Sequence, residues 1–204
     1  MRRVCDVCGK IAIYYSRESG VHYCKSCLER SVEKRVKKEL SRVGITRGDK
    51  VLIYLPLFCQ NAGSLFLSVY LKTFGEWRGI TTIIFREGNS GKNFGMSDLS
   101  DNLLERASWI SRGLKVKKVL LPLPKEVYLL LFLSAFSNGK LREFFAFHYP
   151  LRKVSVEEIE KITGEKARWK RDLIRKLLEM ERKRATILSQ ALSFAEKLKA
   201  CLQI

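Results

Sequence analysis

The chain has 204 residues, 46% of them hydrophobic, so it can bury a sizeable core as one domain with an appendage or as two small domains. It carries 39 Lys and Arg residues against 21 Asp and Glu residues, a formal net charge of +18 that is spread over the whole chain. This excess favours a polyanionic partner, nucleic acid before an anionic membrane, although a protein that is merely basic is an alternative.

Neither a signal peptide nor a membrane helix is predicted. Met1, Arg2 and Arg3 lead directly into a cysteine pair, and no apolar segment follows, so we expect a cytoplasmic protein. The longest apolar run, residues 127–136, is far shorter than the roughly 20 residues that a membrane helix needs. It indicates a buried helix instead.

Four of the six cysteines, Cys5, Cys8, Cys24 and Cys27, form the pattern C-x2-C-x15-C-x2-C. This spacing is typical of a tetrahedral zinc site, because each C-x2-C unit is a tight turn that presents two thiolates to one ion. Four protein ligands close the coordination shell, so we expect a structural Zn²⁺. Two disulfides are an alternative that a cytoplasmic location disfavours, and His22 could replace one ligand.

A basic helix is predicted directly after the cysteines. Apolar residues recur at helical spacing from Leu28 to Val43, and Gly44 should end the helix. The other face of this helix is charged. Such a face is often only solvated, but five like charges beside a zinc site could also contact a phosphate backbone. They are Arg30, Lys34, Arg35, Lys37 and Lys38.

From residue 48 onward the pattern alternates between strand and helix. Strands are expected at residues 50–55, 80–85, 116–121 and 143–147, and helices at residues 64–73, 99–110 and 127–136. This alternation predicts an α/β fold whose parallel sheet is covered on both faces, giving three layers. We expect a zinc ribbon over residues 1–30, a basic linking helix over 31–47, the α/β domain over 48–150 and a helical region over 151–204.

The C-terminal helices carry a second basic surface. Together with the first helix it supplies the candidate RNA-binding residues, which are Lys34, Arg35, Lys37, Lys38, Lys170, Arg171 and Arg175.

The strand-loop-helix over residues 51–69 has the layout of a phosphate cradle. In nucleotide-binding α/β proteins, glycines let backbone N–H groups close on the phosphate at a helix N-terminus. Here the loop has a single glycine and neither lysine nor aspartate, and apolar residues crowd the place of a phosphate. We expect Pro56, Leu57, Phe58 and Cys59 to fill the pocket or to face a partner. Cys59 is either a reactive thiol or, more simply, a buried apolar side chain.

A family resemblance accounts for this order of features. CDVCGKIAIYYSRESGVHYCKSCLERSVEKRVKKEL, followed by GDKVLIYL, resembles the opening of the tRNA 2-thiolation proteins, PP-loop ATP-pyrophosphatases with an N-terminal zinc knuckle. NLLERASWISRGLKVKKVLL and YPLRKVSVEEIEK are similar, with lower specificity, to later segments of that family. The resemblance implies a shortened fold of the adenine nucleotide α-hydrolase-like (PP-loop) type, with an N-terminal zinc ribbon and C-terminal helices. In active members, ATP adenylates a tRNA uridine and sulfur replaces its oxygen.

The chain departs from the family's catalytic motifs. Where active members have SGGxDS, residues 56–64 read PLFCQNAGS, and only Ser64 survives. Where they have a GHNxDD-type motif, residues 121–127 read LPLPKEV, with Glu126 as the only acid. ATP is therefore not expected to bind.

This loss of catalytic motifs resembles that of the non-catalytic second subunit of the cytoplasmic tRNA 2-thiolation complex. Our hypothesis is a pseudoenzyme that joins a catalytic tRNA thiolase in a hetero-oligomer and binds tRNA. Two alternatives stay open. One is an active ATP-dependent thiolase with a divergent phosphate loop that uses Cys59, and the other is a zinc-ribbon scaffold that does not bind RNA.

Overall fold

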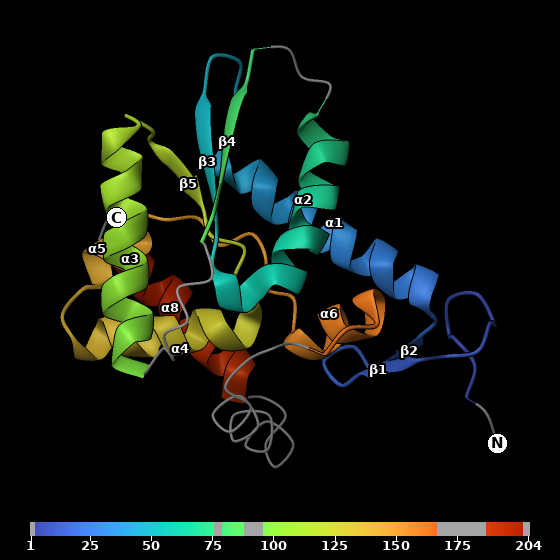
Figure 1. The fold of residues 1–204 in the computed structure, drawn as a ribbon. Coiled ribbons are helices and arrows are strands. Elements are labelled where there is room, and N and C mark those ends of the chain that lie inside the picture. Colours follow the sequence, from blue (N-terminus) through green and yellow to red (C-terminus); the bar gives the residue numbers. More distant parts are fainter. Residues whose placement is uncertain (1–2, 76–78, 88–95, 167–186, 202–204) are drawn as a thin grey trace.

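The computed structural model describes residues 3–75, 79–87, 96–166 and 187–201, and its fold is drawn in Figure 1. The chain opens with a small antiparallel hairpin of β1 (Tyr14–Ser16) and β2 (Val21–Tyr23). It continues into α1 (Lys25–Val43), the predicted basic helix. Gly44 ends α1 as expected, in the left-handed conformation (φ 64°), with its N–H bonded to the carbonyl of Ser41. The helix is continuous from the cysteine cluster to this turn.

A three-stranded parallel sheet lies at the centre of the α/β part. Its order is β4 (Thr81–Arg86), β3 (Lys50–Leu55), β5 (Lys118–Leu120), and Leu52 of β3 pairs with Ile83 and Val119 on its two sides. The central strand is buried from Val51 to its end, as a parallel strand with both faces covered should be. The predicted parallel α/β arrangement is confirmed.

Two groups of helices pack around this sheet, and Figure 1 shows α2 and α3 on opposite sides of it. In one group α1, α2 and α6 contact one another, and in the other α4 contacts α3, α5 and α8. The bounds are α2 (Gln60–Phe74), α3 (Met96–Gly113), α4 (Lys125–Ser137), α5 (Leu141–Phe145), α6 (Val156–Thr163) and α8 (Ile187–Cys201).

The apolar run over residues 127–136 forms α4, a buried helix as predicted. Its aromatic side chains join a cluster in which Phe144 lies 5.2 Å from Tyr128, 5.6 Å from Phe132 and 4.8 Å from Tyr149, measured between ring centroids. None of the described helices is long and apolar enough to cross a membrane.

The strand predicted over residues 143–147 is wrong, because Leu141–Phe145 form the short helix α5. Leu141, Phe144 and Phe145 are spaced i, i+3 and i+4, and this spacing places all three on the side of α5 that packs into the core. Only His148 reaches the sheet, where it forms a single parallel bridge with Leu120 of β5.

Candidate functional site

The four N-terminal cysteines gather in one place. The Sγ atoms of Cys5, Cys8, Cys24 and Cys27 all lie within 4.8 Å of one another, and the Cys8 and Cys24 sulfurs are 3.4 Å apart. A tetrahedral ion with Zn–S bonds of about 2.3 Å needs sulfurs about 3.8 Å apart, so this donor set fits Zn²⁺. Cys8 is exposed, whereas the other three side chains are buried.

Local backbone structure sets this geometry. The first knuckle is closed by two hydrogen bonds, from the Gly9 N–H to the Cys5 carbonyl (2.8 Å) and from the Cys5 N–H to the Lys10 carbonyl (2.7 Å). In the second, Cys24 is the N-cap of α1 and Cys27 lies in its first turn. The positive end of the helix dipole there favours thiolates over thiols.

The protonation of the thiols follows from the same geometry. Burial acts to raise the pKa of Cys5, but hydrogen bonds to backbone groups at Cys24, Val7 and Cys8 outweigh it and lower the pKa to about 6. Burial raises the pKa of Cys27 to about 12. A bound cation would deprotonate that thiol, since metal ligation and thiolate formation are coupled.

His22, the alternative ligand, has other partners. Its Nδ1 lies 3.2 Å from Asp6 Oδ2, and its Nε2 lies 3.0 Å from the Arg3 guanidinium. The Asp6 carboxylate also accepts the backbone N–H of His22 at 2.6 Å, which ties the first knuckle to β2. His22 therefore braces the hairpin beside the cysteines.

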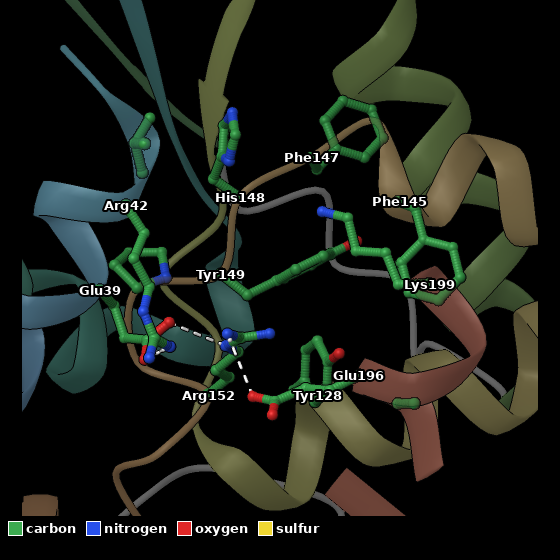
Figure 2. Close-up of a pocket in the computed structure, with 13 residues that line it drawn as sticks. Glu39, Arg42, Tyr128, Phe145, Phe147, His148, Tyr149, Arg152, Glu196 and Lys199 are labelled. Carbon is green, nitrogen blue, oxygen red and sulfur yellow. Dashed lines mark hydrogen bonds and ion pairs between the residues drawn. The ribbon is translucent and has the colours of Figure 1, made fainter. Parts of the chain in front are cut away.

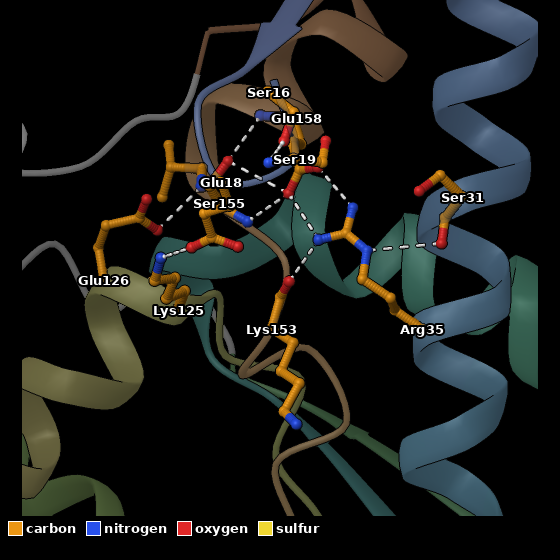
Figure 3. Close-up of polar contacts among 11 residues, drawn as sticks. Ser16, Glu18, Ser19, Ser31, Arg35, Lys125, Glu126, Lys153, Ser155 and Glu158 are labelled. Atoms are coloured by element: carbon orange, nitrogen blue, oxygen red, sulfur yellow. Dashed lines mark hydrogen bonds and ion pairs between the residues drawn. The ribbon is translucent and has the colours of Figure 1, made fainter. Parts of the chain in front are cut away.

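The sequence-predicted RNA-binding residues divide into three groups. Lys34, Lys37 and Lys38 are exposed on α1, and Lys37 pairs with Glu33 at 2.8 Å. Arg35 points the other way, toward α6 (Figure 3), where its guanidinium pairs with Glu158. The third group, Lys170, Arg171 and Arg175, lies outside the described residues.

Apolar residues of the loop after β3 are buried or half-buried. Pro56 is buried, and Leu57–Cys59 form a 3₁₀ turn in which the Cys59 N–H bonds the Pro56 carbonyl at 3.0 Å. Leu57 and Phe58 are half-buried and Cys59 is 2% exposed. Because the turn feeds directly into α2, the helix starts at Gln60, four residues before the predicted start.

Gly63, the single glycine of this loop and helix, serves packing. A Cβ at this position would lie 3.1 Å from Cδ2 of Leu55, which is tighter than ordinary van der Waals contact. The glycine lets α2 approach the end of β3 closely.

An acid that sequence analysis missed lies against this loop. Glu87 directly follows β4, its side chain is 9% exposed, and its Oε2 accepts the Leu57 N–H at 3.2 Å. Its Oε1 accepts the Tyr54 hydroxyl and lies 3.4 Å from the Arg106 guanidinium. One signal could have found it: Glu87 directly follows the strand that is parallel to β3, so it lies at the same sheet edge as the loop.

The buried carboxylate affects its neighbours. Burial, and then the negative charge of Glu87, raise the pKa of Cys59 well above its ordinary value. Burial and the hydrogen bond to Glu87 raise the pKa of Tyr54 as well. Cys59 is thus a neutral core thiol in this structure, with neither the exposure nor the acidity of a nucleophile.

The start of α4, within residues 121–127, forms a structural junction. Lys125 and Glu126 open α4 and are both buried. Lys125 pairs with Glu18 in the hairpin turn, and Glu126 Oε2 accepts the Val156 N–H at 2.9 Å at the start of α6. These contacts join the cysteine module, α4 and the C-terminal region (Figure 3).

Comparison with known proteins relates the fold to that of a solved tRNA thiolase, whereas sequence comparisons find nothing. No protein-family model matches the chain. No curated protein matches its sequence either. Among solved structures, the fold is similar to the U34-tRNA thiolase NcsA from Methanococcus maripaludis, described with its [4Fe-4S] cluster. The TM-score is 0.67 at 16% sequence identity, over 96% of this chain and 86% of that one. The predicted fold class is thereby confirmed: this chain has the α/β fold of a tRNA thiolase, with a four-cysteine cluster before it and helices after it.

Proposed function

We propose that this protein is a non-catalytic component of a tRNA 2-thiolation system, which binds a catalytic thiolase of the same fold and tRNA. One observation carries the proposal. The fold is similar to that of a tRNA thiolase, and the family resemblance implies that backbone N–H groups of the loop after β3 bind a phosphate in active members. In this chain the Leu57 N–H of that loop donates to the carboxylate of Glu87 instead.

Electrostatics supports this interpretation. The loop presents the N–H of Leu57 to the Glu87 carboxylate, whose charge is offset, among the described residues, only by the half-exposed Arg106 at 3.4 Å. A triphosphate brought to the loop would meet this buried negative charge at short range. Neither lysine nor metal-binding aspartate is present between Leu55 and Leu65 to offset that repulsion. Binding ATP there would require expelling Glu87 and unwinding the turn over Leu57–Cys59.

A basic surface supports the RNA-binding part of the proposal. Lys34, Lys37 and Lys38 project from α1 near the cysteine module, and a structural Zn²⁺ held by that module would fix the start of the helix. Contacts of this kind go to phosphates, so log affinity should fall with log salt by about 0.7–0.9 per phosphate contacted.

ATP binding tests the non-catalytic assignment. Calorimetry with ATP and magnesium should show no micromolar binding, and the amide resonance of Leu57 should not move. Micromolar binding that shifts the Leu57 resonance would favour the alternative, an active thiolase with a divergent loop. A catalytic thiolase of the same fold, titrated in parallel, shows that the assay detects the complex.

Charge reversal tests the RNA-binding assignment. The triple variant Lys34→Glu, Lys37→Glu, Lys38→Glu should weaken tRNA binding about a hundredfold or more at 0.1 M salt. A matched control reverses Lys50, Lys115 and Lys117, which are exposed but lie off α1. Equal loss in both triples would mean non-specific attraction, and no loss in the α1 triple would favour a scaffold without RNA binding.

Co-purification tests the partner. Protein isolated from its native cell should elute with a chain that carries an intact phosphate loop, and an assembly of this chain alone would contradict the proposed hetero-oligomer.

A further inference from the structure

A pocket of about 140 Å³ lies away from the loop after β3, between the end of α1, the segment from Phe145 to Arg152, and α8 (Figure 2). A cavity needs only about 10–15 Å³ of such volume to hold a water molecule, so this one can hold a polyatomic ion with some of its water. The walls carry aromatic rings from Tyr128 and Phe145, and charged groups project between them.

The two carboxylates of the pocket are already shared among several cations. Arg152 on one wall pairs with Glu39 of α1 (Nε to Oε2, 2.9 Å) and with Glu196 of α8 (Nη2 to Oε1, 3.2 Å). Arg42 also pairs with Glu39, at 2.7 Å, and Lys153 lies 3.6 Å and 3.7 Å from the same two acids. Glu39 and Glu196 are therefore already paired with these three cations.

Lys199 adds a fourth positive charge that has no such pairing. Its Nζ lies 5.8 Å from the centroid of the Phe145 ring, and within the described part of the chain no carboxylate lies within 4 Å of it. The side chain is half-buried, and burial followed by the charge of Arg152 lowers the pKa of Lys199. Holding an ammonium group there without a counter-ion is unfavourable.

His148 contributes a hydrogen-bonding group at the same place. The bridge to Leu120 fixes its backbone, and its ring lines the pocket above Lys199 (Figure 2). Burial and then the charges of Lys199, Lys118 and Arg152 lower the pKa of His148. This lowered pKa favours the neutral imidazole, which can donate one N–H to an anion.

We propose that this pocket binds a phosphate group, held by the Lys199 ammonium, the Arg152 guanidinium and an N–H of His148. Among the lining residues, the cations Arg42, Arg152 and Lys199 exceed the carboxylates Glu39 and Glu196 by one. Lys153, which lies beside the pocket near the same two acids, raises the excess to two, and a phosphate dianion would balance it. Aromatic walls reduce the competition from water. The site is separate from the loop after β3 and does not depend on the function proposed above.

Histidine NMR of the full chain with inorganic phosphate tests the site. The chain has two histidines, and His22 in the cysteine module serves as an internal reference. Phosphate should shift the His148 resonances saturably and raise the pKa of His148, because a nearby anion stabilises the imidazolium. His22 should not respond. Shifts of both histidines in parallel, or none at His148 up to high millimolar phosphate, would overturn the proposal.

Two substitutions on α8 separate binding from general charge. Lys199→Met keeps the hydrocarbon stem over Phe145 but removes the charge, and phosphate affinity should fall about tenfold. Lys199→Arg should restore most of it. The control Lys197→Met removes an exposed charge that does not line the pocket and should leave affinity unchanged. Equal losses for Lys199→Met and Lys197→Met would overturn the assignment, and thermal melts of each variant exclude misfolding.

The source of the phosphate is then resolved by competition. A nucleoside monophosphate and a short single-stranded RNA are each titrated against bound inorganic phosphate, with His148 as the reporter. Displacement by RNA at lower concentration assigns the pocket to a backbone phosphate, and displacement by the mononucleotide assigns it to a small ligand. If phosphate shifted the amide resonance of Leu57 and left the His148 resonances unchanged, phosphate would bind at the loop after β3, and this result would overturn the proposal.

Discussion

Arg35 of α1 and Glu158 of α6, 123 residues apart in sequence, form a two-pronged ion pair at the junction of the N-terminal and C-terminal parts of the fold (Figure 3). The side chains are 29% and 7% exposed. Arg35 also donates to the Lys153 carbonyl, and Glu158 completes a capping box with Ser155. This one contact orients the basic helix against the segment that closes the domain.

Removing either charge should therefore be costly, because the other charge would lose its ion partner at a largely buried junction. Arg35→Met and Glu158→Gln should each lower the free energy of unfolding by about 3 kcal/mol in urea titrations. The double variant should lose clearly less than the sum. Lys34→Met, one position away and exposed, should change stability by no more than about 0.5 kcal/mol. Similar losses for Arg35→Met and Lys34→Met would show that the pair is not a structural contact.

The inward direction of Arg35 shows where sequence reasoning reaches its limit. Helical spacing placed Leu28, Val32, Val36 and Leu40 on the buried stripe of α1, and all four are in the core. Arg35 lies at the margin of that stripe, and its direction depends on Glu158. No periodicity of α1 can reveal that partner, so the sequence alone groups Arg35 with the exposed lysines.

Features that depend on residues close together in sequence were predicted better than features that depend on distant residues. Cysteine spacing predicted the cluster, and Gly44 ends α1 in the left-handed conformation as expected. The role of Glu87 is not predictable from local sequence, because it depends on the parallel pairing of β4 with β3. That pairing brings Glu87 close to Leu57, 30 residues earlier in the chain. The helix at Leu141–Phe145 was mistaken for a strand because five residues are too few for periodicity to separate the two.

Loss of one cysteine tests the metal site. Cys8 is the exposed member, so Cys8→Ser disturbs packing least while removing a thiolate. The purified protein should carry stoichiometric zinc by elemental analysis, and the variant should lose it and melt at a lower temperature. Cys59→Ala, a buried cysteine outside the cluster, should keep the metal. Zinc retained in Cys8→Ser, or iron in place of zinc, would contradict a structural zinc site.

Chemical labelling tests the state of Cys59. With 2% of its surface exposed and its pKa raised by burial and by Glu87, this thiol should resist iodoacetamide in the native protein. It should react once urea unfolds the chain, and mass spectrometry of the peptide follows the difference. Rapid modification of native Cys59 at neutral pH would revive the hypothesis of a thiolase that uses it as a nucleophile.

Acid should weaken the turn that leads into β3. Asp49 Oδ2 lies 2.7 Å from Lys118 Nζ and accepts the Thr46 N–H at 2.6 Å, and Lys118 followed by Thr46 lowers the pKa of Asp49 to about 2. Because the pKa of Asp49 is lower in the folded state, the contribution of its carboxylate to stability is present above the unfolded pKa of about 3.9 and is lost as the pH falls toward 2.

Wild type should exceed Asp49→Asn in stability by a constant amount above about pH 5. Urea titrations from pH 7 downward should show this gap closing below about pH 4, and comparing the two proteins cancels any loss of metal that both suffer in acid. A gap that stays constant down to the lowest pH at which both proteins fold would mean that the Asp49 carboxylate does not stabilise the turn through its charge.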